Sequence, residues 1–559
     1  MISRECIQSC KMIKIILKWK VFIFWFFFIL FCSFGLRVLR IYFDKQPIFG
    51  DEAIYIHWSQ MMRSEPSLRF VPLSDGKQPL FMWITIPFLK IFNDPLFAGR
   101  ILSAICGLIS TGGIMILSLL LFESVKASLV SGLIYAISPF TVFFDSMALS
   151  DSMLSMFGVL FILFTIITIK KVRLDTAILA GFCLGGALLT KSPALIFVLF
   201  LPLTLFIYNW PKKFKDKFYD LSVFVFLFTF TISIAYGFYN ILRLGPNFHM
   251  ISIRNKDYVY PLNHLVESFF DPLLPFLSRI WEYFWIMGPS FIVLLFLAGL
   301  YWGFKKFRRE TLVLVALGFI PIFVVAEFSK ILTARYIYFS IPYLFILTSL
   351  FFYPFDPINK FVFTKKGRGL NLFNPSGYLG LNLSGRFGNL FGKKIYFLSF
   401  LTFFIFIFHS LYIDYLLITE PQSANLPRSE RSGYFEEWTS GYGIKEISMY
   451  LRNLYENKPN EKIVVGTEGY FGTLPDGLQI YLNDLPEITV VGVGQPIREI
   501  PKPLIESKVS GNKTYLVVNS SRLLLNLDNP KIKLIEKFPK ALMPDNTREE
   551  LYLIEIIGS

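Results

Sequence analysis

Residues 21–55 read VFIFWFFFILFCSFGLRVLRIYFDKQPIFGDEAIY, an apolar run that is soon followed by an acidic pair. The run from 21 to 43 is long enough to cross a bilayer, which takes about 20 apolar residues. It is too long for the apolar part of a signal peptide, and no small-residue cleavage site follows it. The stretch therefore predicts a first membrane-spanning helix, with Asp51 and Glu52 beside the membrane.

The composition of the whole chain agrees with a membrane protein. Of 559 residues, 54% are hydrophobic, 18% are aromatic and only 17% are charged. A soluble protein of this length carries more charge. We predict a polytopic α-helical membrane protein with about eleven spans, near residues 21–43, 97–122, 125–143, 152–170, 174–189, 192–210, 219–243, 284–304, 311–328, 335–353 and 395–418.

The net charge of +15 could suggest nucleic acid as a partner. The basic residues, however, lie in short clusters between apolar runs, which is the pattern of cytoplasmic loops. Eleven spans place every basic cluster on the cytoplasmic side, including a long loop at 354–394 and the N-terminus. One missed helix would move every later loop to the opposite side of the membrane, so this agreement constrains the number of spans. We therefore predict a multi-pass cell-membrane protein that does not bind nucleic acid.

The same topology places several segments on the outer face. They are 44–96, 144–151, the region around Lys191, 244–283, 329–334 and everything after 419. Residues 79–93 are apolar but short for a span, and we assign them to the membrane interface.

The polar C-terminal part, 420–559, differs from the membrane domain at 1–419. Residues 444–455 have helical spacing of apolar positions, and alternating β-branched residues predict strands. The predicted strands are 462–465, 478–482, 488–491, 514–518, 531–535 and 551–554. Roughly 140 residues are enough for a separate core. We predict a soluble α/β domain on the outer face. None of the five cysteines lies in it, so no disulfide framework is proposed.

Eight polar residues gather on the predicted outer face. They are Asp51, Glu52, Lys77, Asp145, Asp151, Lys191, Arg335 and Tyr336. Ionisable groups at membrane depth are costly and therefore candidates for function. A carboxylate can take a proton from an acceptor hydroxyl, and cations can hold a phosphate leaving group. Two of the carboxylates, such as Asp51 and Asp151, could instead hold a divalent cation.

Each candidate also has a structural interpretation. Asp51 could cap the helix that follows it, and Glu52 could be a solvated acid of the first turn. Asp145 and Asp151 could be loop residues, with Asp151 as a helix cap. Lys191 and Arg335 could anchor helix ends among lipid headgroups. His57 has no metal-ligand spacing around it and is interpreted as an interfacial residue.

Six short motifs occur in an order that resembles a known superfamily. They are 50–55 (GDEAIY), 76–81 (GKQPLF), 98–103 (AGRILS), Asp145 with 148–151 (ALSD), 185–191 (GGALLTK) and 334–336 (ARY). Over residues 20–350 the chain resembles the GT-C superfamily of lipid-dependent glycosyltransferases. The similar branch contains protein O-mannosyltransferases and the aminoarabinose transferase of lipid A.

The resemblance implies a glycosyltransferase with a polyprenyl-phosphate sugar donor, undecaprenyl or dolichyl, and inversion at the anomeric carbon. It implies Asp51 as the catalytic carboxylate, Asp151 as its partner, and Lys77, Lys191 and Arg335 as lipid-phosphate contacts. Members differ in metal dependence, so Mg²⁺ or Mn²⁺ stays open. The segment Lys77-Gln78-Pro79 lacks the doubled proline or the acid–lysine pair that is often found there in the family. Residues 420–559 do not match the best-known accessory domains of the family. The acceptor can be a protein, a lipid or a glycan.

Two other classes of protein would share some of these features. A transporter or flippase of lipid-linked sugars also needs many helices, but paired repeats or broken helices near the midplane would be expected, and neither is clear. A non-enzymatic assembly protein would act through residues 420–559.

Overall fold

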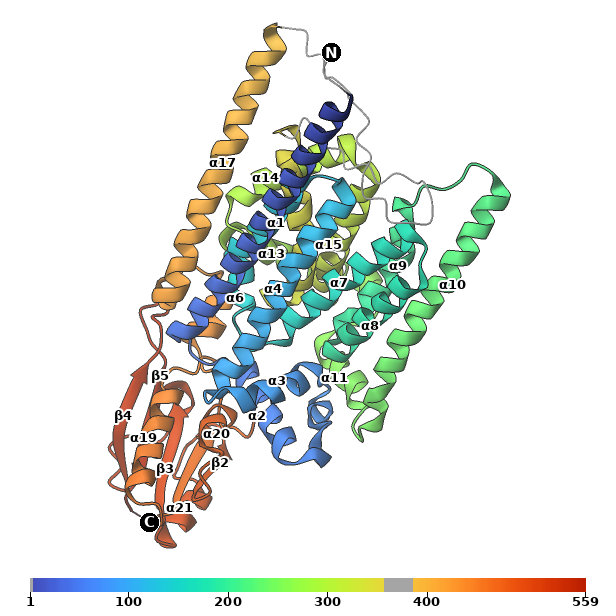
Figure 1. Ribbon diagram of the computed structural model, residues 1–559. Helices are drawn as coiled ribbons and strands as arrows, with labels where there is room; N and C mark the ends of the chain where they lie inside the picture. Colours follow the sequence, from blue (N-terminus) through green and yellow to red (C-terminus); the bar gives the residue numbers. More distant parts are fainter. Residues whose placement is uncertain (1–3, 356–385, 559) are drawn as a thin grey trace. The chain divides into compact units, whose positions relative to one another are not determined.

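The computed structural model describes residues 4–355 and 386–558, and Figure 1 shows its elements. The chain forms two compact units. The first unit comprises Met1–Leu39, Ala104–Asp145 and Ser150–Tyr415. The second unit comprises Arg40–Ser103, Ser146–Leu149 and Leu416–Ser559. The segment after the first span, which is predicted to lie on the outer face, thus groups with the C-terminal residues. The predicted cytoplasmic loop 354–394 falls mostly outside the described residues and stays a prediction.

Long apolar helices make this a multi-pass membrane protein. Within the described ranges, seven helices are long and apolar enough to span: Trp19–Phe43, Pro95–Phe122, Ser150–Lys171, Phe214–Leu244, Arg308–Phe328, Ala334–Tyr353 and Leu398–Thr419. Shorter apolar helices occur at Leu80–Ile91, Val125–Ile137, Leu174–Thr190 and Ser192–Ile207. Each predicted span corresponds to one helix or to a run of two or three consecutive helical elements. The 12-residue helix α3 (Leu80–Ile91) is shorter than a span, as expected for residues 79–93.

The elements of the membrane-spanning part follow the order of the chain (Figure 1). They are α1 (Arg4–Phe43), α4 (Pro95–Phe122), α5 (Val125–Ile137), α6 (Pro139–Phe144), α7 (Ser150–Lys171), α8 (Leu174–Thr190), η3 (Ser192–Ala194), α9 (Leu195–Thr204), η4 (Leu205–Ile207), α10 (Phe214–Tyr239), η5 (Asn240–Leu244), α11 (Met250–Tyr258), α12 (His264–Glu267), α13 (Leu273–Met287), α14 (Phe291–Lys306), α15 (Arg308–Phe328), η6 (Ala334–Ser340), α16 (Ile341–Thr348), η7 (Ser349–Phe355) and α17 (Arg386–Thr419).

The predicted span at 284–304 falls on a bent pair of helices and not on a single straight helix. Helices α13 and α14 meet at an angle of 104°. Gly288 and Pro289 lie between them, and the ring of a proline cannot continue the hydrogen-bond pattern of the preceding helix. Inside the predicted span 125–143, Ser138 separates α5 from α6, which begins at Pro139.

Two glycines let α8 and α10 pack closely in the first unit. A Cβ added at Gly181 would lie 2.9 Å from the carbonyl oxygen of Thr231, and one added at Gly185 would lie 2.8 Å from Cβ of Phe238. Small residues four positions apart allow such an approach in membranes.

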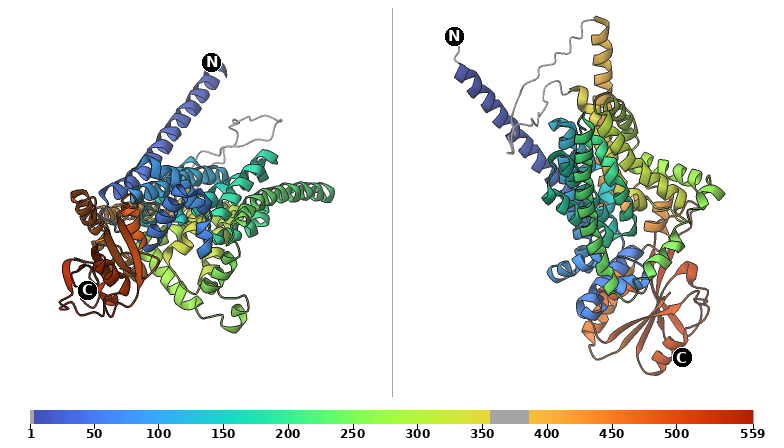
Figure 2. Two further views of the ribbon diagram at one scale, coloured as in Figure 1. Left: turned by 90° about the horizontal axis from the view of Figure 1, so that it is seen from below. Right: turned by 90° about the vertical axis from the view of Figure 1, so that its right-hand side faces the viewer.

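The second unit combines short helices with one sheet (Figure 2). The short elements after the first span are α2 (Gly50–Ser64), η1 (Pro66–Leu68), η2 (Val71–Asp75) and α3. The C-terminal elements are η8 (Pro421–Ser423), α18 (Arg428–Arg431), the π-helix η9 (Ser432–Glu436), α19 (Ile444–Asn457), β1 (Ile463–Glu468), α20 (Asp476–Leu482), β2 (Ile488–Gly494), α21 (Lys502–Val509), β3 (Lys513–Asn519), η10 (Ser520–Arg522), β4 (Ile532–Pro539) and β5 (Glu550–Ile556).

The five strands lie in the order β2-β1-β3-β5-β4. Strand β1 pairs in parallel with β2 and β3, whereas β5 pairs antiparallel with β3 and β4. Leu504 of α21 packs in a core with Leu516, Val518 and Ile554 on one face of the sheet. This confirms the predicted α/β fold of the C-terminal part.

The predicted strand 478–482 is the helix α20. Its residues alternate in polarity, which favoured a strand. Because β1 and β2 run parallel, however, the chain between them must cross from one end of the sheet to the other. A helix in the connection fits that need.

Helix α2 packs against the C-terminal elements within the second unit. The ring nitrogen Nδ1 of His57 lies 2.6 Å from Oδ1 of Asp476 at the start of α20. Further along α2, Gln60 donates to the carbonyl of Ile480 at 2.9 Å. The helix that follows the first span is therefore fixed to the α/β elements by directed contacts.

Candidate functional site

Asp51 and Lys77 form an ion pair in the second unit. Nζ of Lys77 lies 3.1 Å from Oδ1 of Asp51 and 3.5 Å from Oδ2 of Asp75. The side chains of Asp51 and Lys77 are 18% and 25% exposed, so both remain accessible. Helix α2 begins at Gly50 with Phe49 as its N-cap. The interpretation of Asp51 as the cap is therefore wrong, although its place in the first turn suits a carboxylate.

Aromatic rings surround the same lysine. Nζ of Lys77 lies 5.1 Å from the ring centre of Tyr55 and 5.8 Å from that of Trp58, both on α2. Burial lowers the pKa of Lys77, but the Asp51 carboxylate outweighs it and leaves the pKa above its ordinary value. Gly76, with φ +67°, supplies the left-handed turn that carries the chain from η2 to this lysine. The ammonium is thus held charged among carboxylates and π-faces.

Glu52 points away from solvent, so the interpretation of a solvated acid is wrong. Its Oε1 accepts from Arg100 Nε at 2.9 Å and from the backbone N–H of Ala148 at 2.7 Å. Its Oε2 accepts from Arg100 Nη2 at 2.9 Å and from the N–H of Phe49 at 3.0 Å. Glu52 and Arg100 are both buried. All of these partners are protein groups, and the predicted substrate contact of Glu52 stays a prediction.

Four predicted residues come together in the first unit. Nζ of Lys191 lies 2.6 Å from Oδ1 of Asp151, the second residue of α7. The same ammonium lies 5.1 Å from the ring centre of Tyr336, and the guanidinium of Arg335 lies 5.6 Å from that ring. Among the described residues, the buried Oδ2 of Asp151 has no hydrogen-bond partner. This cluster repeats the carboxylate–lysine pairing of the second unit.

Asp145 belongs to a fully buried network of the first unit, so its interpretation as an ordinary loop residue is wrong. Its Oδ2 accepts from Nε of Arg37 at 3.0 Å and from Nη2 at 2.9 Å. Tyr135 donates to it at 3.1 Å and Tyr338 to Oδ1 at 2.6 Å. These contacts tie α1 to α5 and η6. The predicted substrate contact of Asp145 stays a prediction.

Sequence reasoning missed Arg37, Arg100 and His57. A guanidinium inside an apolar run is costly without a carboxylate partner. Arg37 and Arg40 within the first span were therefore a usable signal. His57 carried no such signal, because its partner Asp476 lies 419 positions away.

The surroundings of Asp51 and Asp151 bear on the possible Mg²⁺ or Mn²⁺ site. A lysine ammonium already lies beside Asp51 and another beside Asp151. Such cations are bound by several oxygen ligands around one point. Within the described ranges, no three His, Cys, Asp or Glu side chains gather in a geometry that could hold a metal ion.

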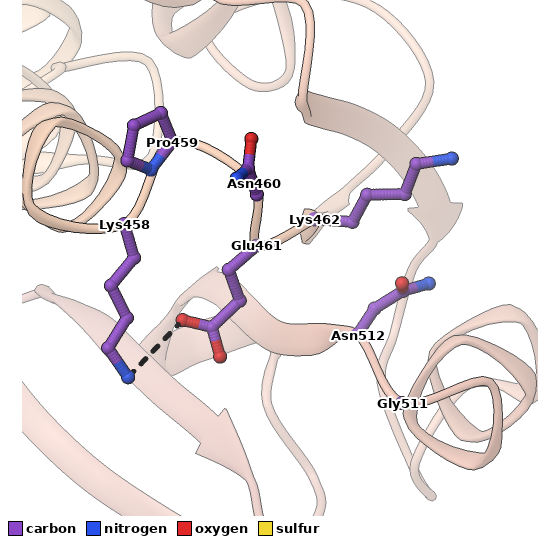
Figure 3. Close-up of a pocket in the computed structure, with 7 residues that line it drawn as sticks. All are labelled: Lys458, Pro459, Asn460, Glu461, Lys462, Gly511 and Asn512. Atoms are coloured by element: carbon purple, nitrogen blue, oxygen red, sulfur yellow. Dashed lines mark ion pairs between the residues drawn. The ribbon is translucent and has the colours of Figure 1, made fainter.

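A surface pocket lies at the amino ends of β1 and β3 (Figure 3). Lys458 and Glu461 face each other across it at 3.9 Å. It contains no predicted site residue. Ligands of open α/β sheets bind at the carboxyl ends of strands, so this pocket is not our candidate site.

The structure thus distributes the predicted residues between the units. Asp51, Glu52 and Lys77 lie in the second unit. Asp145, Asp151, Lys191, Arg335 and Tyr336 lie in the first.

Comparisons with known proteins bear on the fold. Residues 76–236 match the family model of dolichyl-phosphate-mannose-protein mannosyltransferase. No curated protein sequence matches the chain. The crystal structure of ArnT from Cupriavidus metallidurans bound to undecaprenyl phosphate is similar, with 14% identity, a TM-score of 0.53, and coverage of 96% of this chain and 98% of that chain.

Archaeal oligosaccharyltransferase AglB from Archaeoglobus fulgidus, in complex with an inhibitory peptide and a dolichol-phosphate, aligns with 11% identity and a TM-score of 0.48. That alignment covers 90% of this chain and 70% of AglB. The likeness to ArnT extends over nearly the whole of both chains. The chain therefore shares the fold of ArnT.

Proposed function

We propose that this chain is a membrane glycosyltransferase that moves a sugar from a polyprenyl-phosphate donor to an acceptor hydroxyl at the outer face of the membrane. The observation that carries the proposal is the accessible ion pair between Lys77 and Asp51, which lies on α2 directly after the first span. The shared fold with ArnT, which was crystallised with undecaprenyl phosphate, supports the class of donor. The match to a mannosyltransferase family model supports the class of reaction.

Asp51 acts as the general base. The oxygen of the acceptor hydroxyl attacks the anomeric carbon from the side opposite the phosphate, and its proton passes to the Asp51 carboxylate. The bond between the anomeric carbon and the phosphate oxygen breaks, and the electron pair leaves with the polyprenyl phosphate. A single displacement of this kind inverts the anomeric centre.

Lys77 stabilises the leaving group. A phosphate oxygen that approaches Nζ replaces part of its interaction with Asp51 and Asp75. The charge that develops on the leaving phosphate is thereby neutralised, while Asp51 becomes freer to accept a proton. Before the donor binds, the Asp51 carboxylate keeps the pKa of Lys77 above its ordinary value, so the phosphate meets a lysine that is a cation.

In the first unit we assign lipid-phosphate contacts to Lys191 and Arg335. Asp151 holds Lys191 through Oδ1 at 2.6 Å. Its Oδ2, buried and without a partner in the described structure, accepts a hydrogen bond from a substrate hydroxyl. Tyr336 keeps both cations in place through its π-face. No step is assigned to a metal ion, because lysines supply the positive charge.

The proposal is tested with Asp51→Asn in membranes supplied with a radiolabelled polyprenyl-phosphate sugar. We expect transfer to fall by roughly 10²–10⁴-fold, as for loss of a general base. Asp257→Asn is the matched control, since that carboxylate is exposed and lies on the same predicted face. Equal thermal stability of the variants shows that they fold. Transfer at the wild-type rate by Asp51→Asn contradicts the assignment.

The bent pair α13–α14 favours a second candidate, a transporter of lipid-linked sugars. A transporter moves its cargo without breaking the sugar–phosphate bond. The same assay separates the two candidates, because only the transferase releases free polyprenyl phosphate.

A further inference from the structure

A short aromatic loop follows β1 in the second unit. It runs from Gly469 to Gly472, and both glycines have positive φ, +69° and +120°. Other residues rarely adopt that conformation. Between them, Tyr470 is 76% exposed and Phe471 is 46% exposed. Two large rings exposed side by side on a soluble domain are unusual and indicate a contact surface.

The ring of Tyr470 lies against the backbone of β2. A Cβ added at Gly494 would lie 3.0 Å from the Tyr470 hydroxyl and 3.5 Å from its Cζ. A Cβ added at Gly492 would lie 3.1 Å from its Cδ1. The two glycines thus leave space for the ring to rest on the strand, while most of the residue stays exposed. This arrangement presents a flat and supported aromatic face.

The loop is joined to the helix that carries Asp51. The ring of Phe471 lies 5.7 Å from that of Trp58 on α2, at an interplanar angle of 31°. Nζ of Lys77 lies 5.8 Å from the centre of the same Trp58 ring. Asp476 accepts from the N–H of Gly472 at 2.8 Å and contacts His57 through its other oxygen. The loop and α2 are therefore fixed to each other by the same carboxylate.

We propose that Tyr470 is a stacking platform for a sugar ring of an uncharged glycan acceptor. The C–H groups on one face of a pyranose pack against the electron-rich face of an aromatic ring. Residues 469–475, GYFGTLP, carry no charge, which suits a neutral glycan. A peptide that binds as an added strand needs main-chain hydrogen bonds and side-chain pockets, and a flat ring offers neither. The inference rests on the proposed function, since it names the acceptor of that reaction.

Binding is measured first, on the full-length protein in detergent, with maltotriose, mannotriose and chitotriose as probes in saturation-transfer NMR. We expect wild type and Tyr470→Phe to bind at least one of these trisaccharides. Tyr470→Leu keeps an apolar side chain but lacks the flat face, and we expect roughly tenfold weaker binding, the size of an aromatic stacking effect. Leu524→Ala, at an exposed apolar residue elsewhere on the domain, should bind like wild type.

Transfer is measured next, with the probe that binds as acceptor. Tyr470→Leu should raise KM for that acceptor without changing kcat or KM for the donor. The proposal is overturned if no trisaccharide binds to wild type, or if Tyr470→Leu binds them equally well. The proposal is also overturned if transfer to a Ser/Thr-containing peptide depends on Tyr470 while no trisaccharide binds. If trisaccharides bind through Tyr470 but wild type releases no polyprenyl phosphate, the platform stands and the proposed function fails.

Discussion

Arg100 and Glu52 form a buried two-point ion pair in which Nε and Nη2 each donate to one carboxylate oxygen at 2.9 Å. Glu52 lies in the first turn of α2, directly after Asp51. The pair therefore fixes the position of the proposed base. A two-point contact also restricts rotation of the helix end more than a single hydrogen bond would.

Breaking this pair should destabilise the protein. Glu52→Gln removes the nearest counter-charge of the buried Arg100 guanidinium and leaves only Asp44, at 3.7 Å. Loss of one partner of a buried pair typically costs about 3–5 kcal/mol. We expect a clearly lower melting temperature in detergent, whereas Glu506→Gln, at an exposed pair, should change little. A melting temperature equal to that of wild type would mean that Glu52 and Arg100 are not paired in the interior.

Removing the Lys77 cation should weaken donor binding. Lys77→Met loses a charge-assisted contact to phosphate, worth about 1.5–3 kcal/mol, or roughly 10–100-fold in donor affinity. Because its folded-state pKa is raised above the ordinary lysine value, the contact should persist as pH rises from 7 to 9. Donor titrations at both pH values measure this. If the donor affinity of wild type falls between pH 7 and 9 while that of Lys77→Met does not, Lys77 deprotonates in this range and the prediction is wrong.

Chelation should leave transfer unchanged. The ammonium groups of Lys77 and Lys191 already neutralise the two candidate carboxylates. We expect equal initial rates with excess EDTA and with added Mg²⁺ or Mn²⁺. Restoration of a lost rate by one of these ions would establish a metal requirement.

Lys540 should make the stability of the second unit depend on pH. Burial lowers its pKa to about 7, against the partly opposing effects of Glu549 and Glu468. Above that pH the unfolded chain binds a proton that the folded chain does not, so stability rises with pH from about 7 to 10, by at most about 1.4 kcal/mol per unit. Lys540→Met should remove this contribution, while the exposed Lys502→Met should retain it. Hydrogen exchange of the β3 and β5 amides measures the free energy of unfolding at each pH. Equal slopes of this free energy against pH in both variants would contradict the prediction.

Labelling can test the predicted topology. None of the five cysteines lies in residues 420–559, so Val509→Cys introduces the only thiol there, at a residue that is 70% exposed. We expect a membrane-impermeant maleimide to label it in intact cells. Labelling only after the cells are opened would place this domain in the cytoplasm.

Several features could be predicted from sequence because each depends on local pattern. Apolar runs indicated the long helices, and β-branched alternation indicated β1, β2, β3, β4 and β5. Lys191 and Asp151 were both chosen as candidates, since ionisable groups at membrane depth are costly. Residues 478–482 were mistaken for a strand because the parallel pairing of β1 with β2 joins segments that are apart in the sequence, and local pattern does not show it.

The site was predictable only in part for the same reason. Glu52 looked like an ordinary first-turn acid, because nothing near it in sequence reveals Arg100. Asp145 looked like a loop residue, although three helical elements bury it. Partners far along the chain decide whether a charge is solvated, and a single sequence does not show them.

The contacts of His57 and Gln60 with α20 have a consequence for exchanging parts between related chains. If residues 420–559 are exchanged alone, α2 loses its contacts with Asp476 and with the carbonyl of Ile480. A workable chimera must carry the segment 40–103 together with the C-terminal part. The same linkage would make these two stretches, distant in the gene, change together as the protein diverges.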